Sequence, residues 1–151
     1  MSDTLAETQA WLHGAFPLVA EMGLELLELA PGHAVTRTPL ARNRNVHGTA
    51  FAGSLSAQAM LTGWIVLVRD LDEARLDAVL VQREATVRYH APITGDPVCR
   101  CTLPAERLAA FRAALLEHGR ARLDADVEIL DATNAAALLT AGYSARMRQP
   151  D

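Results

Sequence analysis

The sequence predicts an α+β fold in which a curved, mainly antiparallel β-sheet wraps around one central buried helix. Three observations point to it. Residues 45–68 contain no Asp, Glu, Lys or Arg, in a chain that is 21% charged. Residues 120–129 alternate charged and apolar side chains, which is typical of a strand with one face in water. Short turn signals join the strands in pairs, and this favours antiparallel pairing. We expect a single domain spanning residues 1–151.

The N-terminal part is expected to form a short helix followed by a β-hairpin. Apolar residues mark a helix around residues 5–12, and either Asp3 or Thr4 is placed to cap it. The stretches 24–30 and 33–40 flank a Pro-Gly pair, which is a strong turn signal. A polar loop then leads into the charge-free stretch.

That stretch predicts a helix from about Gly53 to Val68, with Ser54 as its N-cap. Its second half has no polar face, so we expect it to be buried on nearly all sides. A membrane-spanning helix needs about 20 mostly apolar residues. The strongly apolar part, Ala59–Val68, has only ten, so a helix buried inside the protein explains the stretch better.

After the central helix, the chain is expected to continue with two strands and a helix. Residues 77–92 form the first strand, and 98–103 form its hairpin partner across a turn at 93–97. Pro104 opens an amphipathic helix, and Gly119 stands at its expected C-terminal stop.

The last two strands are residues 120–129 and 135–147, joined by a turn at 131–134. The element order is therefore α-ββ-α-ββ-α-ββ. One helix is too apolar to lie outside the sheet, and an antiparallel sheet curved around it satisfies both facts. This arrangement is the hotdog architecture.

Composition excludes several classes of function. A net charge of −4 offers no basic face for nucleic acid. The start of the chain has neither the basic nor the apolar region of a secretory signal, so we expect a cytoplasmic protein. Cys99 and Cys101 stand two apart in a strand, which favours two reduced thiols facing the same way over a disulfide. The five histidines are scattered singly, and no metal site is expected.

Two common catalytic motifs are missing around the central helix. A nucleophilic serine elbow needs G-x-S-x-G, and the segment around Ser54 lacks both glycines, because Ala52 and Ser56 stand at their positions. No glycine-rich run has the spacing of a phosphate-binding loop.

What remains is the N-terminus of the buried helix, whose first amides have no partners within the helix. Such an end can stabilise the oxyanion that forms when water attacks a carbonyl carbon, and Gly53 lacks the Cβ that would block the approach. Asn45 and His47, just upstream, are candidates to orient a water molecule or act as a base. The alternative is that both only satisfy the backbone of the loop.

These residues resemble the hotdog-fold thioesterase superfamily, whose motif runs roughly N-x-x-G-x-x-H-G-G before the central helix. Asn45, Gly48 and Gly53 match it, whereas Phe51 stands at the histidine and Met60 at the usual catalytic acid.

A later segment also resembles the family. Tyr89, Pro92, Gly95 and Asp96 are similar to its Tyr-x-x-Pro corner and Gly-Asp turn. From about residue 9 onward the chain most resembles the thioesterase domain found behind some bacterial acetyltransferases.

The resemblance implies a hydrolase that cleaves a thioester of coenzyme A or of an acyl-carrier protein with water, without a further cofactor. Asn45 would position the water, and the Gly53 and Ser54 amides would hold the thioester carbonyl. Because Met60 replaces the acid, water activation falls to another group, such as His47. Hotdog sites usually lie at a subunit interface, so the resemblance also implies a homodimer or a dimer of dimers.

The residues expected to contact substrate line the same helix or face it. They are Thr49, Phe51, Gln58, Trp64 and Gln82. Arg42 and Arg44 are placed to meet nucleotide phosphates. Two alternatives stay open: an acyl-thioester-binding module without catalysis, favoured by Met60, and a dehydratase or hydratase, which would need a histidine with an acidic partner near the helix start.

Overall fold

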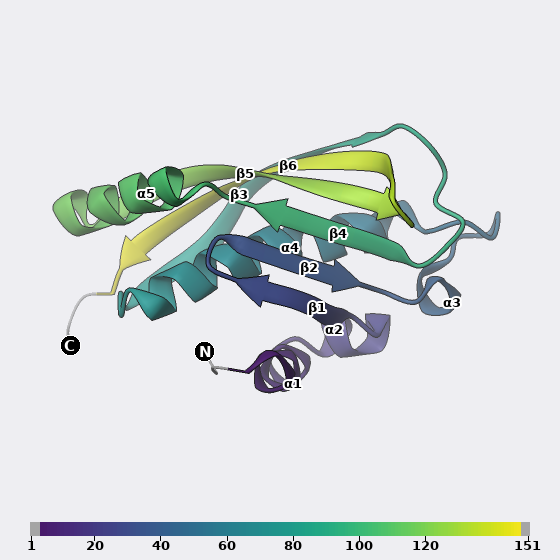
Figure 1. Ribbon diagram of the computed structural model, residues 1–151, viewed down its shortest axis with the longest axis horizontal. Helices are drawn as coiled ribbons and strands as arrows, with labels where there is room; N and C mark the ends of the chain where they lie inside the picture. The colour runs from purple at the N-terminus through teal and green to yellow at the C-terminus, as the bar shows by residue number, and fades with distance from the viewer. Residues whose placement is uncertain (1–3, 149–151) are drawn as a thin grey trace.

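The computed structural model describes residues 4–148 and shows one sheet curved over one long helix (Figure 1). In chain order the elements are α1 (Leu5–Ala15), α2 (Pro17–Met22), β1 (Glu25–Ala30), β2 (His33–Arg37), α3 (Leu40–Asn43), α4 (Ala52–Glu73), β3 (Ala78–Tyr89), β4 (Pro97–Thr102), α5 (Ala105–His118), β5 (Arg120–Asp131) and β6 (Asn134–Met147). The predicted order is confirmed, with α2 and α3 as additions.

The N-terminal helix is capped by Thr4, which is one of the two N-caps that the sequence predicts. The Thr4 hydroxyl accepts the Glu7 N–H at 3.2 Å, while Asp3 lies outside the described residues. A second helix follows because Pro17 occupies its first turn, where the missing N–H costs nothing. It ends at Gly23, which adopts a left-handed conformation (φ 66°).

The six strands form one antiparallel sheet in the order β1-β2-β4-β5-β6-β3. The predicted hairpin between 77–92 and 98–103 is wrong: β3 pairs with β6, and β4 lies between β2 and β5. Burial gives the physical reason. Cys99 and Cys101 of β4 are fully buried, which suits a central strand, whereas β3 is largely exposed and suits an edge.

Helix α4 is longer than predicted and begins differently. It starts at Ala52 with Phe51 as N-cap, so the prediction of Ser54 as the cap is wrong. The charged residues after Val68 continue the helix, because Arg69 and Glu73 form an ion pair one turn apart (2.6 Å).

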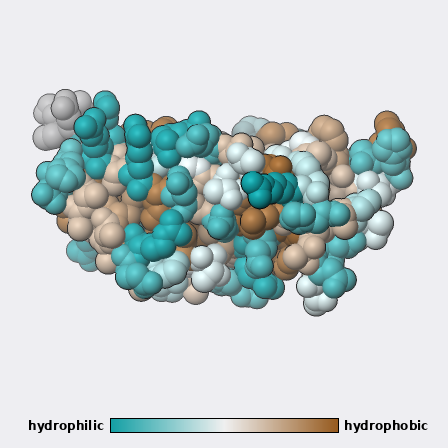
Figure 2. All heavy atoms as spheres, turned by 90° about the horizontal axis from the view of Figure 1, so that it is seen from above, coloured by the Kyte–Doolittle hydropathy of each residue, from teal (hydrophilic) through white to brown (hydrophobic). Residues whose placement is uncertain are grey.

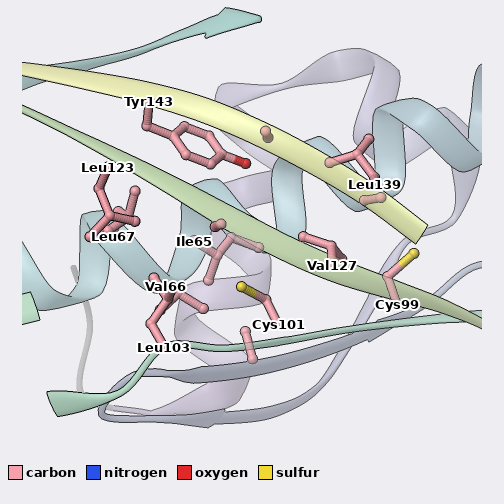
Figure 3. Packing of buried hydrophobic residues seen from close by; sticks show 14 of the residues in the cluster. Ile65, Val66, Leu67, Cys99, Cys101, Leu103, Leu123, Val127, Leu139 and Tyr143 are labelled. Carbon is pink, nitrogen blue, oxygen red and sulfur yellow. The ribbon is translucent and has the colours of Figure 1, made fainter. Parts of the chain in front are cut away.

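One side of α4 packs against the concave face of the sheet (Figure 3). Tyr143 of β6 points its ring at the helix, and its hydroxyl donates to the Met60 carbonyl oxygen at 2.7 Å. This approach requires glycine at position 63, because a Cβ there would lie 2.5 Å from Tyr143 Oη. Within the Thr-Gly-Trp segment at 62–64, the glycine therefore serves packing, because it lets Tyr143 reach the helix.

A small polar network is sealed between α4 and β2. Gln58 is fully buried; its side-chain oxygen accepts from Thr38 (2.9 Å), and its NH₂ group donates to the carbonyl oxygens of Thr36 (3.2 Å) and Pro97 (3.1 Å). The Thr36 and Thr62 hydroxyls share a hydrogen bond of 2.7 Å. Because each polar group has a partner, the network fixes how the helix sits on the sheet without leaving a costly unpaired group.

Cys99 and Cys101 are free thiols that point into the core, as predicted from their spacing (Figure 3). Burial raises the pKa of both thiols, that of Cys101 to about 12, so they act as small apolar side chains. Hydrophilic side chains cover much of the surface seen from above (Figure 2). Within residues 4–148 no helix is long and apolar enough to cross a membrane.

The contact between Gly63 and Tyr143 generates a prediction. Gly63→Ala forces the added methyl group into Tyr143 Oη, so we expect unfolding to become easier by about 1–3 kcal/mol in urea titrations. Adding Tyr143→Phe removes the hydroxyl oxygen that clashes with the new methyl group. The double variant should therefore lose less stability than the sum of the losses in the two single variants. Gly14→Ala is the matched control, because no atom lies within 4 Å of its added Cβ. Equal effects at positions 14 and 63 would contradict this explanation.

Candidate functional site

The N-terminus of α4 is open and uncapped. The first bond of its internal ladder joins the Leu55 N–H to the Phe51 carbonyl at 3.0 Å, so the Ala52, Gly53 and Ser54 amides precede that ladder. In the described part of the chain no side chain caps this end. The amides of a 22-residue helix therefore present their partial positive charge at the surface, where Ala52 and Gly53 are exposed.

Asn45 holds together the loop that leads to this helix end. Its Oδ1 accepts the N–H groups of His47 (2.8 Å) and Thr49 (3.2 Å). Its NH₂ group donates to Thr49 Oγ1 (2.9 Å) and to the Ala50 carbonyl oxygen (3.4 Å). Both N–H donors and the acceptor are thus engaged within the loop, and this arrangement matches the alternative in which Asn45 satisfies local backbone groups.

His47 is exposed and takes part in this loop through its backbone N–H. Among residues 4–148 no hydrogen bond or ion pair of its side chain is seen, so the acidic partner that a hydratase would need does not appear beside it.

Phe51 packs beside Gly53 at the start of the helix. A Cβ at Gly53 would stand 2.4 Å from Phe51 Cε1, so the ring occupies the space beside the glycine. Phe51 is 53% exposed, so its ring borders the open helix start without being buried there.

A cavity of about 360 Å³ opens beside the helix start, between Ala52, Thr49 and the end of β3. The Tyr89 hydroxyl donates to the Ala52 carbonyl oxygen at 3.2 Å and shares a 3.0 Å hydrogen bond with Ser56 Oγ. His90 lines the same cavity. Sequence reasoning did not propose either residue for the site, although the Tyr-x-x-Pro corner was the signal that pointed to this place.

The structure does not bring all of the predicted substrate-contacting residues together. Gln58 is sealed in the polar network and faces away from the helix start. Trp64 and Gln82 line a second cavity, of about 500 Å³, further along α4, and Met60 lines it with them. Thr49 alone of the five lines the cavity beside Ala52.

Two carboxylates anchor the corner that supports both the loop and β3. Asp131 accepts the N–H groups of Thr94 (2.9 Å) and Gly95 (3.1 Å), and these bonds hold its pKa below the usual value. Asp96 accepts the Leu40 N–H at 2.8 Å, which ties α3 to the same corner. The Gly-Asp turn seen in the sequence is therefore a scaffold for the site.

Within the described residues no group of three His, Cys, Asp or Glu side chains is arranged to hold a metal ion. Arg42, in the last turn of α3, and Arg44, which follows that helix, are exposed before the site.

A family model described as "Putative thioesterase (yiiD_Cterm)" matches residues 5–147. Two solved structures at 26% identity cover nearly the whole chain. One is a Pseudomonas aeruginosa protein described as a "probable thioesterase", with a TM-score of 0.88 over 98% of this chain and 99% of that one. The other is described as the "putative thioesterase" from Shewanella oneidensis, with a TM-score of 0.84 over 98% and 100%.

A third structure, of a Chlorobaculum tepidum protein of unknown function, has a TM-score of 0.87 at 24% identity over 95% of this chain and 94% of that one. It supports the fold alone. Together these likenesses confirm that the sheet wrapped around α4 is the hotdog fold.

The loop geometry generates a prediction about Asn45. Asn45→Ala removes the acceptor of the His47 and Thr49 amides, so we expect both to exchange with solvent about three- to tenfold faster in NMR hydrogen-exchange measurements. Asn45→Asp keeps that acceptor and should preserve the protection. His47→Ala is the control, since only its backbone takes part. Unchanged exchange in Asn45→Ala would show that the loop is held by other contacts.

Proposed function

Because this chain belongs to the yiiD_Cterm thioesterase family, we propose that it hydrolyses an acyl thioester of coenzyme A or of an acyl-carrier protein at the N-terminus of α4. The observation that carries the proposal is the uncapped start of a long helix with one side packed on the sheet, which presents free amides at the edge of a cavity. Backbone amides in that position are suited to a developing oxyanion.

The reaction assigned to this site is a simple acyl transfer to water. Water attacks the thioester carbonyl carbon and loses a proton, and the carbonyl oxygen becomes an oxyanion held by the Gly53 and Ser54 amides. The intermediate then collapses, the C–S bond breaks, and the thiolate takes up a proton to leave as the free thiol beside a carboxylic acid.

The attacking water is best supported in the cavity beside Ala52. Thr49, Tyr89 and His90 supply its polar groups, and a neutral imidazole can accept the proton of the water near pH 7. Asn45 then acts as a positioning residue, because its amide is committed to the loop. His47 remains an alternative base only if the loop rearranges.

Recognition of the carrier is assigned to the exposed arginines. Arg42 and Arg44 precede the site, and their guanidinium groups suit the phosphates of coenzyme A or of a carrier's phosphopantetheine arm. The reduced, buried thiols of β4 favour a reducing compartment such as the cytoplasm.

A second candidate is a binding module that holds an acyl thioester without cleaving it. Met60 favours it, because this residue stands where the better-known hotdog enzymes carry an acid and here lines an apolar cavity. The engaged amide of Asn45 favours it as well.

We also propose that the working form is a homodimer, alone or as a dimer of dimers, joined along β3. In the described sheet β3 has a neighbour on one side only, and it exposes Val79 (47%), Val81 (51%) and Tyr89 (49%). A long edge strand with exposed apolar residues is a template for pairing with another strand. A second copy would also border the cavities that β3 lines.

The hydrolysis proposal predicts release of free thiol from acyl-CoA thioesters. Gly53→Pro removes the amide donor within the first helical turn, where proline is tolerated best, and kcat should fall about 10²- to 10³-fold. Both substitutions are made in a Phe51→Ala background, because the Cβ that each one adds would otherwise lie 2.4 Å from the Phe51 ring. Gly53→Ala is then the matched control, since it adds the Cβ but keeps the N–H. Circular dichroism verifies that both variants stay folded.

Two results would count against catalysis. Equal turnover in Gly53→Pro and Gly53→Ala would remove the amide from the mechanism. Absence of turnover on every acyl-CoA, with measurable binding of a non-hydrolysable alkyl-CoA thioether, would favour the binding module and would leave carrier-protein thioesters as the remaining substrates to assay.

The homodimer proposal predicts a mass of two chains in light scattering after size-exclusion chromatography. Val81→Lys places a charge on the exposed edge of β3 and should shift the protein towards the monomer. Leu116→Lys is the control, because Leu116 is also exposed (65%, against 51% for Val81) but lies on α5. A wild-type monomer would contradict the proposal.

A further inference from the structure

The open side of α4 carries a continuous apolar stripe that starts at the proposed reaction site. Gly53, Ala57, Met60 and Trp64 recur at spacings of three and four, so they lie on one side of the helix. This side is turned away from the buried contacts of Gln58 and Thr62, and all three side chains of the stripe are half-buried.

A groove runs along this stripe between α2 and β3. Its cavity of about 500 Å³ is lined by Phe16, the N-cap of α2, by Leu18 from α2, by Met60 and Trp64 from α4, and by Leu80 and Gln82 from β3. The lining is almost wholly apolar, and the volume lies within the roughly 300–1,000 Å³ typical of small-molecule sites.

Trp64 closes the far end of this groove. On one side its ring stacks on Trp11, with centroids 6.1 Å apart and planes 8° apart, and meets Phe16 edge-on at 5.5 Å. On the other side its indole N–H donates to the Leu80 carbonyl oxygen at 3.4 Å. The ring therefore spans the groove from the N-terminal helices to β3.

Space continues beyond this ring. A separate cavity of about 490 Å³ lies on the far side, where Trp11, Trp64, Val68 and Val79 line it together with the charged residues Asp72, Arg75, Asp77 and Arg148. Trp64 is thus a partition between the apolar groove and this more polar space, and its removal would join them.

We propose that this groove holds the acyl chain of the substrate and that Trp64 sets the greatest length that fits. The inference rests on the hydrolysis proposed above, because it places the thioester at Gly53. The occupant is an unbranched fatty acyl chain, because the groove is apolar and its lining on α4 begins at Ala57, one helical turn from the Gly53 amide.

The helix itself provides the scale. Eleven residues separate Gly53 from Trp64, and at about 1.5 Å per residue they span about 16 Å. An extended hydrocarbon chain advances about 1.25 Å per carbon for bonds of about 1.52 Å. Side chains on a helix lean towards its N-terminus, so the Trp64 ring shortens the usable length. A chain of about 8 to 12 carbons fits.

This predicts a specificity profile. Across acyl-CoAs of 4 to 18 carbons, kcat/KM should rise about fourfold per methylene, the gain from burying each one, and then fall beyond about 12 carbons. Trp64→Ala should move the optimum to longer chains by at least four carbons. Trp64→Phe, which keeps an aromatic ring, should retain the wild-type optimum.

A second variant should shorten the optimal acyl chain while leaving Trp64 unchanged. Ala57→Leu fills the groove one turn from Gly53, so the optimum should move to chains of about four carbons. It also serves if Trp64→Ala fails to fold. Leu116→Ala, on the exposed side of α5, is the control and should leave the profile unchanged.

Intrinsic fluorescence gives a readout that does not need turnover. The chain has two tryptophans, Trp11 and Trp64, and both stand at the end of the groove. A non-hydrolysable decyl-CoA thioether should change their emission saturably, and Trp64→Phe should reduce the change.

The outcomes separate the two proposals. Hydrolysis with the same chain-length profile in wild type, Trp64→Ala and Ala57→Leu would overturn the groove but not the thioesterase. Decyl-CoA thioether binding without hydrolysis of any thioester would overturn catalysis but support the groove. Emission that responds to protein concentration and not to the thioether would show that a second copy fills the groove, and this would overturn the inference.

Discussion

The close seating of α4 on the sheet is the constraint on which the rest of the structure depends. Gly63 allows the ring of Tyr143 to reach the helix backbone, and the hydroxyl of that ring pairs with the Met60 carbonyl. The hydrogen bonds of Gln58 to Thr38, just after β2, and to Pro97, at the start of β4, tie the helix to a second part of the sheet. A helix held this firmly can keep its N-terminus open without fraying, and so the site needs no capping side chain.

The sequence was sufficient to predict the hotdog fold, because the fold follows from burial patterns. A charge-free helix has to lie inside, and the alternating strand 120–129 has to have one wet face. Strand neighbours were predicted less well. The hairpin of 77–92 with 98–103 was wrong, because proximity in sequence outweighed the burial of Cys99 and Cys101, which marks β4 as a central strand.

The location of the candidate site was visible in the sequence, but the engagement of its side chains was not. Gly53 and the helix start stand where the motif implied. The side chain of Asn45 bonds within its own loop, and the ring of Phe51 packs beside Gly53. Both arrangements depend on side-chain rotamers and local hydrogen bonds, which no residue pattern encodes. His90 lines the cavity because β3 ends beside Ala52, and this proximity arises only in the tertiary structure.

The two sides of α4 have different roles, and this difference explains why the charge-free stretch is apolar even on the side that faces away from the sheet. Its buried side at Gln58, Thr62 and Gly63 is bound to the sheet, so changes there act on stability. Its open side at Ala57, Met60 and Trp64 lines the groove, and there Trp64 also contacts two aromatic neighbours and the Leu80 carbonyl oxygen. An outward-facing side of a surface helix would ordinarily be polar. Apolar residues there need another partner, and a hydrocarbon chain held next to the helix start satisfies that need while placing its carbonyl at the free amides.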